Sequence, residues 1–364
     1  MKKASDNQYS AIVNFIKPSI ASLAAVLIFM ALITVKTNCN AQSAQQYYLL
    51  ALSKADHTLA IVDPVTFKVI ARVPVGPDPH EVIASADGKT AYVSNYAGGS
   101  LHELDIIDLV AQKPLPSVDT KPLIGLHGLD FANGKVWFTA EGSKTIGSYD
   151  PQSGQVDWAM GTGQGRTHMI YVTPDAKRIY TTNVSSGTVS ILVDSLLPPP
   201  TSPTGQTFPG AKPHWDWIHT IIPVSIGSEG FDVSPDGKEL WTAAAPDGVI
   251  SIIDLTELKK SGKIDSKALG ANRLKFTPDG KRVLVTSLSN GNLFIYDAAT
   301  HKELKRINTG RGAAGILVSP DGLRAFIGCT ADNYVAVVDL KTLQITGHID
   351  VGGGPDGLAW AVKP

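Results

Sequence analysis

Ser234-Pro235-Asp236-Gly237-Lys238 is a five-residue unit that the chain repeats, with small changes, through most of its length. Related units occupy residues 85–89, 173–177, 277–281 and, without the lysine, 319–322. In a tight turn, Pro presets φ at the first central position, Asp binds nearby backbone N–H groups and Gly adopts positive φ. Each copy therefore predicts a turn between two antiparallel strands.

The segments around each turn have the length and pattern of β-strands. A short apolar segment such as 231–233 precedes the turn, and an alternating one such as 178–181 follows it. A third segment ends in aspartate, as at 249–254, and a fourth follows, as at 345–349. Four antiparallel strands per unit predict the blade of a β-propeller.

Seven such units can be counted from the residues at which the innermost strands begin. These residues are His80, His127, His168, Glu229, Asn272, Ala314 and Asp356. The unit that starts at Tyr47 lacks a first strand, and the tail 357–362 supplies one with nothing after it. We therefore predict an all-β, seven-bladed propeller over residues 42–364, a single domain closed by pairing of the N- and C-terminal strands.

The N-terminal segment has the features of an export signal. Lysines precede an uncharged apolar run at 20–35, and Cys39-Asn40-Ala41 follows as a small-residue cleavage motif. Residues 1–41 are predicted to be a signal peptide cleaved after Ala41, with an N-terminal membrane anchor as the alternative. Lipidation of Cys39 is disfavoured by the polar residues before it. We expect an exported protein, whether periplasmic, secreted or at the cell surface.

Charge and cysteine content limit the partners and the covalent links of the mature chain. The full chain has a net charge of -1, and removal of residues 1–41, with four Lys and one Asp, leaves -4. A negative chain gives little support to nucleic-acid binding. Cys329 would then be the single remaining cysteine, which excludes an intrachain disulfide.

The repeat unit resembles the YVTN-type β-propeller repeat family. The resemblance rests on the turn followed by Tyr92-Val93-Ser94-Asn95 or Tyr180-Thr181-Thr182-Asn183 and spans roughly residues 47–362. It implies a propeller fold and a place among surface or periplasmic proteins, or among enzyme domains that include copper and haem reductases. The family has no fixed catalytic residue to transfer, so function must be argued from the site.

A Pro-rich stretch at 196–213 interrupts the blade that begins at His168. Its prolines cannot take part in a regular strand ladder, so we predict an insertion after that blade's third strand. The aromatic and polar segment 214–219 follows it. This segment would either serve as a recognition loop or pack its tryptophans on the bottom of the propeller, and the second is favoured.

The predicted ring gathers polar residues at the mouth of its channel. Five adjacent blades offer Asp-His-His-His-Glu at equivalent positions. His80, His127 and His168 could bind a divalent transition metal, with Glu229 or Asp356 as a fourth ligand or general base. The alternative is that each histidine is a hydrated channel residue without a ligand.

Further polar residues are predicted on the same rim and could bind a ligand. They are Arg166, Arg273, Arg311, Asn95, Asn183 and His57. Guanidinium groups beside a polar funnel would hold a carboxylate or phosphate.

No phosphate loop, covalent haem motif, nucleophile elbow or zinc-protease helix is present in the sequence. The sequence therefore favours a monomeric exported binding or scaffold propeller that takes a small molecule or an extracytoplasmic protein at the channel mouth. The alternative is a metal-dependent (Cu, Zn or Fe) oxidoreductase or lyase, and the second alternative is single-stranded nucleic-acid binding. Apart from a possible divalent transition metal, the sequence does not identify a cofactor.

Overall fold

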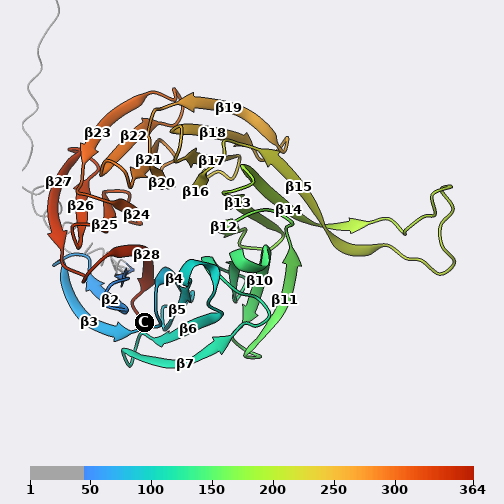
Figure 1. Cartoon of the computed structure of the whole chain (residues 1–364), viewed down its shortest axis with the longest axis horizontal. Coiled ribbons are helices and arrows are strands. Elements are labelled where there is room, and N and C mark those ends of the chain that lie inside the picture. Colours follow the sequence, from blue (N-terminus) through green and yellow to red (C-terminus); the bar gives the residue numbers. More distant parts are fainter. Residues whose placement is uncertain (1–44) are drawn as a thin grey trace, which may run out of the picture. The chain divides into compact units, whose positions relative to one another are not determined.

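The computed structural model describes residues 45–364, which form seven four-stranded antiparallel sheets around a central channel (Figure 1). The segment 1–41, predicted to be the export signal, lies outside the described residues. From the channel outwards, the sheet that joins the two ends contains β28 (Pro355–Val362), β1 (Tyr47–Ser53), β2 (Thr58–Asp63) and β3 (Lys68–Pro74). The predicted seven-bladed propeller is confirmed.

The other six sheets follow in chain order, each again running from the channel outwards. They are β4 (Pro79–Ala84), β5 (Thr90–Asn95), β6 (Glu103–Asp108) and β7 (Lys113–Asp119); β8 (Leu126–Ala132), β9 (Lys135–Ala140), β10 (Thr145–Asp150) and β11 (Gln155–Gly161); β12 (Thr167–Val172), β13 (Arg178–Asn183), β14 (Thr188–Leu197) and β15 (His214–Pro223). The last three are β16 (Ser228–Val233), β17 (Glu239–Ala244), β18 (Val249–Asp254) and β19 (Lys259–Asp265); β20 (Ala271–Phe276), β21 (Arg282–Ser287), β22 (Asn292–Asp297) and β23 (Glu303–Asn308); β24 (Ala313–Val318), β25 (Arg324–Cys329), β26 (Tyr334–Asp339) and β27 (Gln344–Ile349).

Helical structure in this part of the chain is confined to two short 3-10 turns, η2 (Ala97–Gly99) and η3 (Glu141–Ser143). None of the helices described in residues 45–364 is long and apolar enough to span a membrane.

The ring closes as the sequence predicted. β28 pairs antiparallel with β1, with Tyr47 opposite Val362 and Leu50 opposite Ala359. The first described strand and the last strand therefore share one blade, and their pairing closes the ring.

The hydrophobic core lies between neighbouring blades. Leu50 and Ile61 of the closing blade, both fully buried, pack with Val82 and Val93 of the next blade. The middle strands of each blade are buried on both faces, which explains their nearly continuous apolar sequences. The outermost strands alternate between buried and exposed residues, as in β11.

Hydroxyl groups fasten four of the innermost strands, β8, β12, β16 and β24, to the preceding blade. Ser94 Oγ donates to the His127 carbonyl at 2.7 Å, and Thr139 Oγ1 donates to the His168 carbonyl at 2.5 Å. Thr182 makes the equivalent bond to the carbonyl of Glu229. These bonds hold the backbone of His127, His168 and Glu229 at the channel mouth.

In most blades, the residue that follows the channel-mouth residue on the innermost strand is glycine. The backbone of the next blade lies too close to this position for a side chain. A Cβ on Gly128 would lie 2.5 Å from the His168 carbonyl oxygen, and one on Gly315 would lie 1.9 Å from that of Asp356. The exceptions at this position are Glu81, Met169 and Arg273. Side chains therefore enter the channel at this depth from only three blades.

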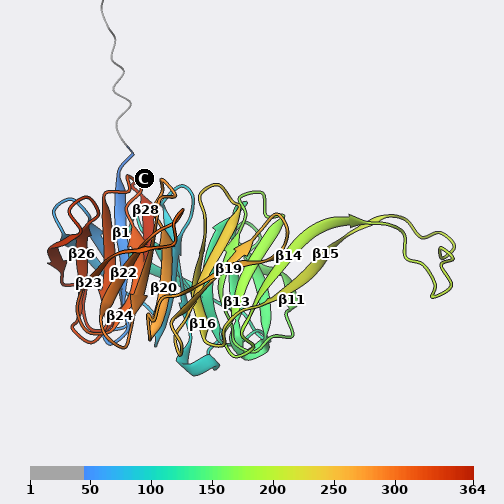
Figure 2. The same cartoon turned by 90° about the horizontal axis from the view of Figure 1, so that it is seen from above.

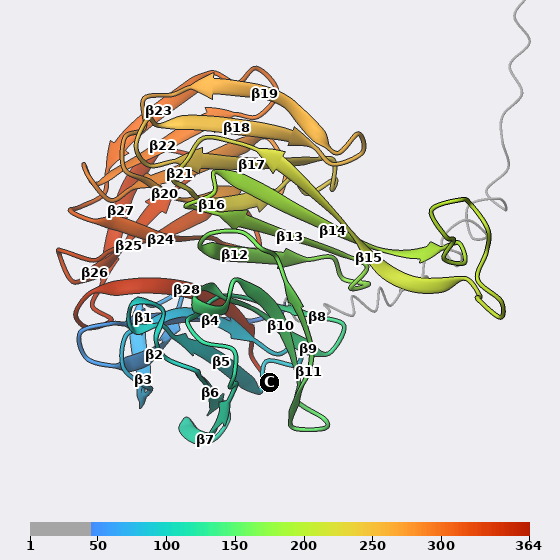
Figure 3. The same ribbon diagram turned by 45° about the vertical axis from the view of Figure 1, so that its right-hand side comes forward.

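The insertion lies at the tip of a long hairpin. β14 and β15 continue their pairing as far as Leu197 opposite His214, so the loop itself spans 198–213, and the hairpin projects away from the ring (Figures 2 and 3). Trp217 packs on Trp158 of the neighbouring blade's outer strand, at 5.5 Å between ring centroids. Trp215, however, is 60% exposed. The favoured packing of both tryptophans on the propeller bottom is therefore wrong, because the strand pairing carries Trp215 outwards.

Candidate functional site

The mouth of the channel holds a polar cavity of about 360 Å³. Its walls are built mainly from the second residues of the innermost strands, as the repeat alignment predicted. Its lining includes His80, His127, His168, Glu229, Asn272, Ala314 and Asp356, together with Lys54, Tyr96, Arg166 and Arg273. The ring thus brings together residues that lie about forty positions apart in the chain.

Lys54 organises one side of this cavity. Its Nζ lies 2.7 Å from His80 Nε2, 3.2 Å from Asp356 Oδ2 and 3.4 Å from Asp78 Oδ1. Burial lowers the pKa of His80, and the neighbouring Lys54 charge acts in the same direction. His80 is therefore a neutral imidazole whose Nε2 accepts from the ammonium while Nδ1–H donates to the Asp78 carbonyl at 3.2 Å.

His168 on the other side lies between two carboxylates. Nδ1 donates to Glu141 Oε1, and Nε2 donates to Glu229 Oε1 at 2.8 Å. Burial alone would lower the pKa of His168, but Glu229 and Glu141 together raise it above its ordinary value. The pKa of Glu229 is lowered because His168 and Arg273 outweigh its burial. His168 is therefore an imidazolium held in place by two carboxylates.

His127 lies between these two groups and is only 1% exposed. Its ring centroid is 3.7 Å from that of His168 and 4.8 Å from that of His80. Burial lowers the pKa of His127 well below its ordinary value, and the nearby His168 charge adds to this effect. His127 is therefore neutral, and within residues 45–364 its Nδ1 has no hydrogen-bond partner.

Two other cavity residues also carry buried polar atoms without partners. Among the residues that the structure describes, Asp356 Oδ1 and Arg273 Nη1 lack a hydrogen bond, although Arg273 Nη1 lies 3.5 Å from Glu229 Oε1. Both residues are 7% exposed. One cavity is thus lined by three side chains, each nine-tenths buried or more, that have unused hydrogen-bonding capacity.

Arg273 also forms the floor of the cavity. Its Nη2 donates to Glu81 Oε1 at 2.6 Å, and this ion pair joins β20 to β4 across the channel. The neighbouring carboxylates Glu81 and Glu229 raise the pKa of Arg273 although burial would lower it. The pair separates the mouth from the deeper channel.

The predicted metal ligands lie together, but most of their nitrogens are engaged. Both nitrogens of His168 face carboxylates, and His80 Nε2 faces the Lys54 ammonium. A metal needs free nitrogen lone pairs, and in this arrangement only His127 retains one. No group of three or more potential ligands with metal-site geometry occurs within residues 45–364. The three-histidine metal site stays a prediction of the sequence.

The predicted ligand-binding residues divide into three groups. Arg166 and Arg273 line the cavity, with Arg166 Nε 3.5 Å from Glu141 Oε2. Arg311 is exposed on the rim and pairs with Asp332, and His57 is exposed in the β1–β2 turn. Asn95 and Asn183 are buried at the ends of β5 and β13 and do not line the cavity.

Sequence reasoning missed Lys54 as a cavity residue. It lies in the turn between the second and third strands of its blade, the same loop position that supplies Tyr96 and Glu141 from the next two blades. Tyr96 Oη donates to Glu141 Oε2, which together with burial raises the pKa of Tyr96 to about 12. Extending the loop alignment from His57 towards the N-terminus by three residues would have found Lys54.

No protein-family model matches the chain, and no curated protein matches it. Several solved structures do match the chain over most of its length. A functionally unknown protein from Desulfotomaculum acetoxidans has a TM-score of 0.68 at 12% identity, with 87% of this chain and 99% of that chain covered. A putative 6-phosphogluconolactonase from Bacteroides fragilis has a TM-score of 0.66 at 15% identity, covering 87% and 98%. A dihydro-heme d1 dehydrogenase has a TM-score of 0.58 at 16% identity, covering 85% and 74%. What these proteins share with the chain is the propeller fold.

Proposed function

We propose that the protein is an exported YVTN-type propeller that binds a small polar molecule in its mouth cavity. A volume of about 360 Å³ lies within the usual range of roughly 300–1,000 Å³ for small-molecule sites. The export signal in residues 1–41 and the YVTN-like repeats support the extracytoplasmic location.

The observation that carries the proposal is the set of unpaired atoms on His127, Asp356 and Arg273. An unsatisfied buried polar atom costs about 1–3 kcal/mol, so three around one cavity favour a molecule that completes them. Arg273 Nη1 can only donate and Asp356 Oδ1, when ionised, can only accept. The ligand must therefore carry both an acceptor and a donor.

The charges around the cavity nearly cancel, which favours a ligand without net charge. Lys54, Arg166, Arg273 and His168 carry the positive charges, whereas Glu81, Glu141, Glu229, Asp356 and, at the edge, Asp78 carry the negative ones. A net-charged ligand would gain little from such a site. Uncharged polyhydroxylated molecules and zwitterions fit it best.

The test is a thermal-shift screen with monosaccharides, sugar lactones and α-amino acids, followed by calorimetry with any compound that raises the melting temperature. Asn272→Leu and His127→Leu should each weaken the binding of such a compound at least about tenfold, because each substitution removes a polar group from the cavity wall. The control Arg311→Ala, on the exposed rim, should bind like the wild type. Equal binding by all four proteins would refute the proposed site.

A second candidate is acid–base catalysis on the bound molecule. It is favoured by a neutral buried His127 with a free nitrogen beside the His168 imidazolium. His127 would act as general base, while His168, fixed by Glu141 and Glu229, would stabilise developing negative charge. Turnover of the ligand by the wild type, with kcat reduced at least about a hundredfold in His127→Gln, would support it.

A further inference from the structure

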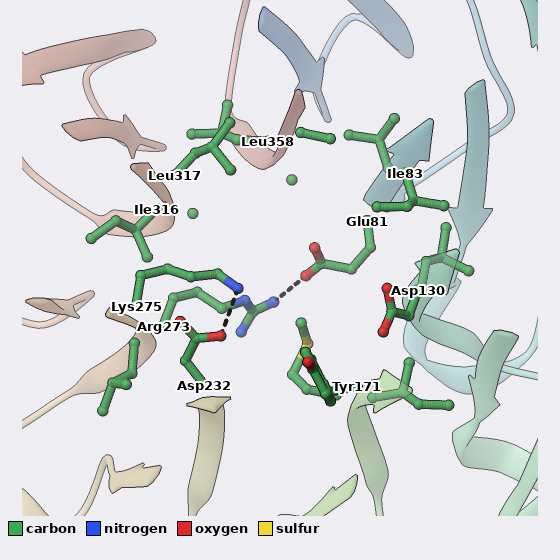
Figure 4. A pocket seen from close by; sticks show the side chains of 18 of the residues that line it. Glu81, Ile83, Asp130, Tyr171, Asp232, Arg273, Lys275, Ile316, Leu317 and Leu358 are labelled. Carbon is green, nitrogen blue, oxygen red and sulfur yellow. Dashed lines mark hydrogen bonds and ion pairs between the residues drawn. The ribbon is translucent and has the colours of Figure 1, made fainter. Parts of the chain in front are cut away.

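The channel holds a second cavity, of about 330 Å³, beyond the Glu81–Arg273 pair (Figure 4). Arg273 is the one residue that lines both this cavity and the mouth. The deeper cavity, here called the inner chamber, is formed largely by residues that lie further along the innermost strands.

The inner chamber has one apolar wall and one polar wall. Ile83 of β4, Leu317 of β24 and Leu358 of β28 lie on one side in Figure 4. The opposite side carries Asp130, Tyr171, Asp232 and Lys275, from β8, β12, β16 and β20. A ligand that fills the chamber must therefore be amphipathic.

The charged groups of the polar wall are paired except for one carboxylate. Arg273 pairs with Glu81 at 2.6 Å, and Lys275 pairs with Asp232 at 3.2 Å. Asp130 makes no ion pair within residues 45–364. With both pairs neutral, the chamber has the net charge of one carboxylate.

Hydrogen bonds hold the Asp130 carboxylate but leave it capacity for a ligand. Its Oδ2 accepts the Val172 N–H at 2.6 Å, and its Oδ1 accepts the Phe131 N–H at 2.8 Å. Each oxygen has a second lone pair. Burial raises the pKa of Asp130 to about 6, although these two hydrogen bonds act to lower it. The carboxylate is therefore ionised at neutral pH, but its negative charge is poorly compensated.

We propose that the inner chamber binds a primary alkylammonium ion, with its ammonium group on Asp130 and its alkyl chain on the wall of Ile83, Leu317 and Leu358. The ammonium supplies the missing positive charge and donates to the free lone pairs of the carboxylate. The alkyl chain of the ligand covers the apolar wall and removes it from water, which a bare inorganic cation cannot do. This site is independent of the proposed mouth ligand.

The test is calorimetric titration of the whole protein at pH 7.5 with ethylammonium, butylammonium and hexylammonium chloride, and with 1-hexanol as the neutral analogue. Affinity should rise about fourfold per added CH₂, and hexylammonium should bind at least about tenfold more tightly than 1-hexanol. Asp130→Asn should weaken hexylammonium binding at least about tenfold, because it removes the charge. Asp216→Asn is the matched control, since Asp216 Oδ1 accepts the next residue's N–H in the same way but lies on the exposed hairpin.

A second measurement needs no variant. Lowering the pH from 7.5 to 5 protonates Asp130 and should weaken hexylammonium binding about tenfold. The other charged groups that line the chamber are Glu81, Arg273, Asp232 and Lys275. Binding that is equal for hexylammonium and 1-hexanol would overturn the proposal. So would binding by sodium as tight as by hexylammonium, unchanged binding by folded Asp130→Asn, or the absence of any alkylammonium binding at millimolar concentration.

Discussion

The mouth cavity and the inner chamber use two positions of the same strands in opposite ways. At the mouth, polar side chains contact one another, as in the bond of Lys54 to His80. Three residues further along, Asp130 and Asp232 instead accept backbone N–H groups of the next blade, from Val172 and Phe276. The mouth contacts therefore join side chains to side chains, whereas the deeper aspartates join a side chain of one blade to the backbone of the next.

The largest effect is expected at the pair that separates the two regions. Arg273→Met would leave the largely buried Glu81 and Glu229 without their shared cation and should lower the free energy of unfolding by about 3–5 kcal/mol. Urea denaturation measures this. Arg311→Met, which breaks an exposed pair, should cost no more than about 1 kcal/mol. Equal losses in the two variants would show that the floor is not a buried ion pair.

The aspartates of the inner chamber should matter more to stability than the polar residues of the mouth. Asp232→Ala removes the acceptor of the Phe276 N–H and the partner of Lys275, so we expect a loss of about 2–3 kcal/mol. Asn272→Ala at the mouth should cost about 1 kcal/mol or less. Thermal and urea unfolding of both variants gives the comparison, and the reverse order would contradict the two roles.

The hydroxyl bonds between blades should have a smaller effect. Thr139→Val keeps the side-chain shape but removes the bond to the His168 carbonyl, and should cost about 1–2 kcal/mol. Ser153→Ala, in an exposed turn, should be nearly neutral. Because the His168 backbone position depends on this bond, Thr139→Val should also weaken ligand binding at the mouth. A Thr139→Val variant as stable as the wild type would show that these hydrogen bonds do not contribute to the stability of the fold.

The smallest expected effect is the pH dependence of stability, which should differ between the mouth cavity and the inner chamber. Because the folded pKa of His168 is raised, its contribution is complete below about pH 6.5, the ordinary value, and is lost as the pH rises through the folded pKa. Asp130 acts between its ordinary value of 3.8 and about 6, where rising pH also lowers stability. Denaturation at several pH values should show the upper step vanish in His168→Gln and the lower step vanish in Asp130→Asn. Both steps surviving in both variants would contradict these assignments.

The repeats predicted the ring because turn chemistry and strand patterns are local properties of the chain. Once closure is assumed, symmetry places His80, His127, His168 and Glu229 around one cavity, which the structure confirms. Pairing within the cavity was not predictable, since it depends on rotamers and on loop residues such as Lys54. The inner chamber was missed because the alignment followed only one position near the start of each innermost strand.

The proposed occupancy of the mouth is tested most directly by the ring nitrogens of His127. In ¹⁵N-labelled protein with a ligand identified by the screen, we expect the Nδ1 resonance of His127 to shift as the ligand saturates, while the resonances of His348 on the outer strand β27 do not change. Calorimetric binding without any change at His127 would show that the ligand does not occupy the mouth cavity.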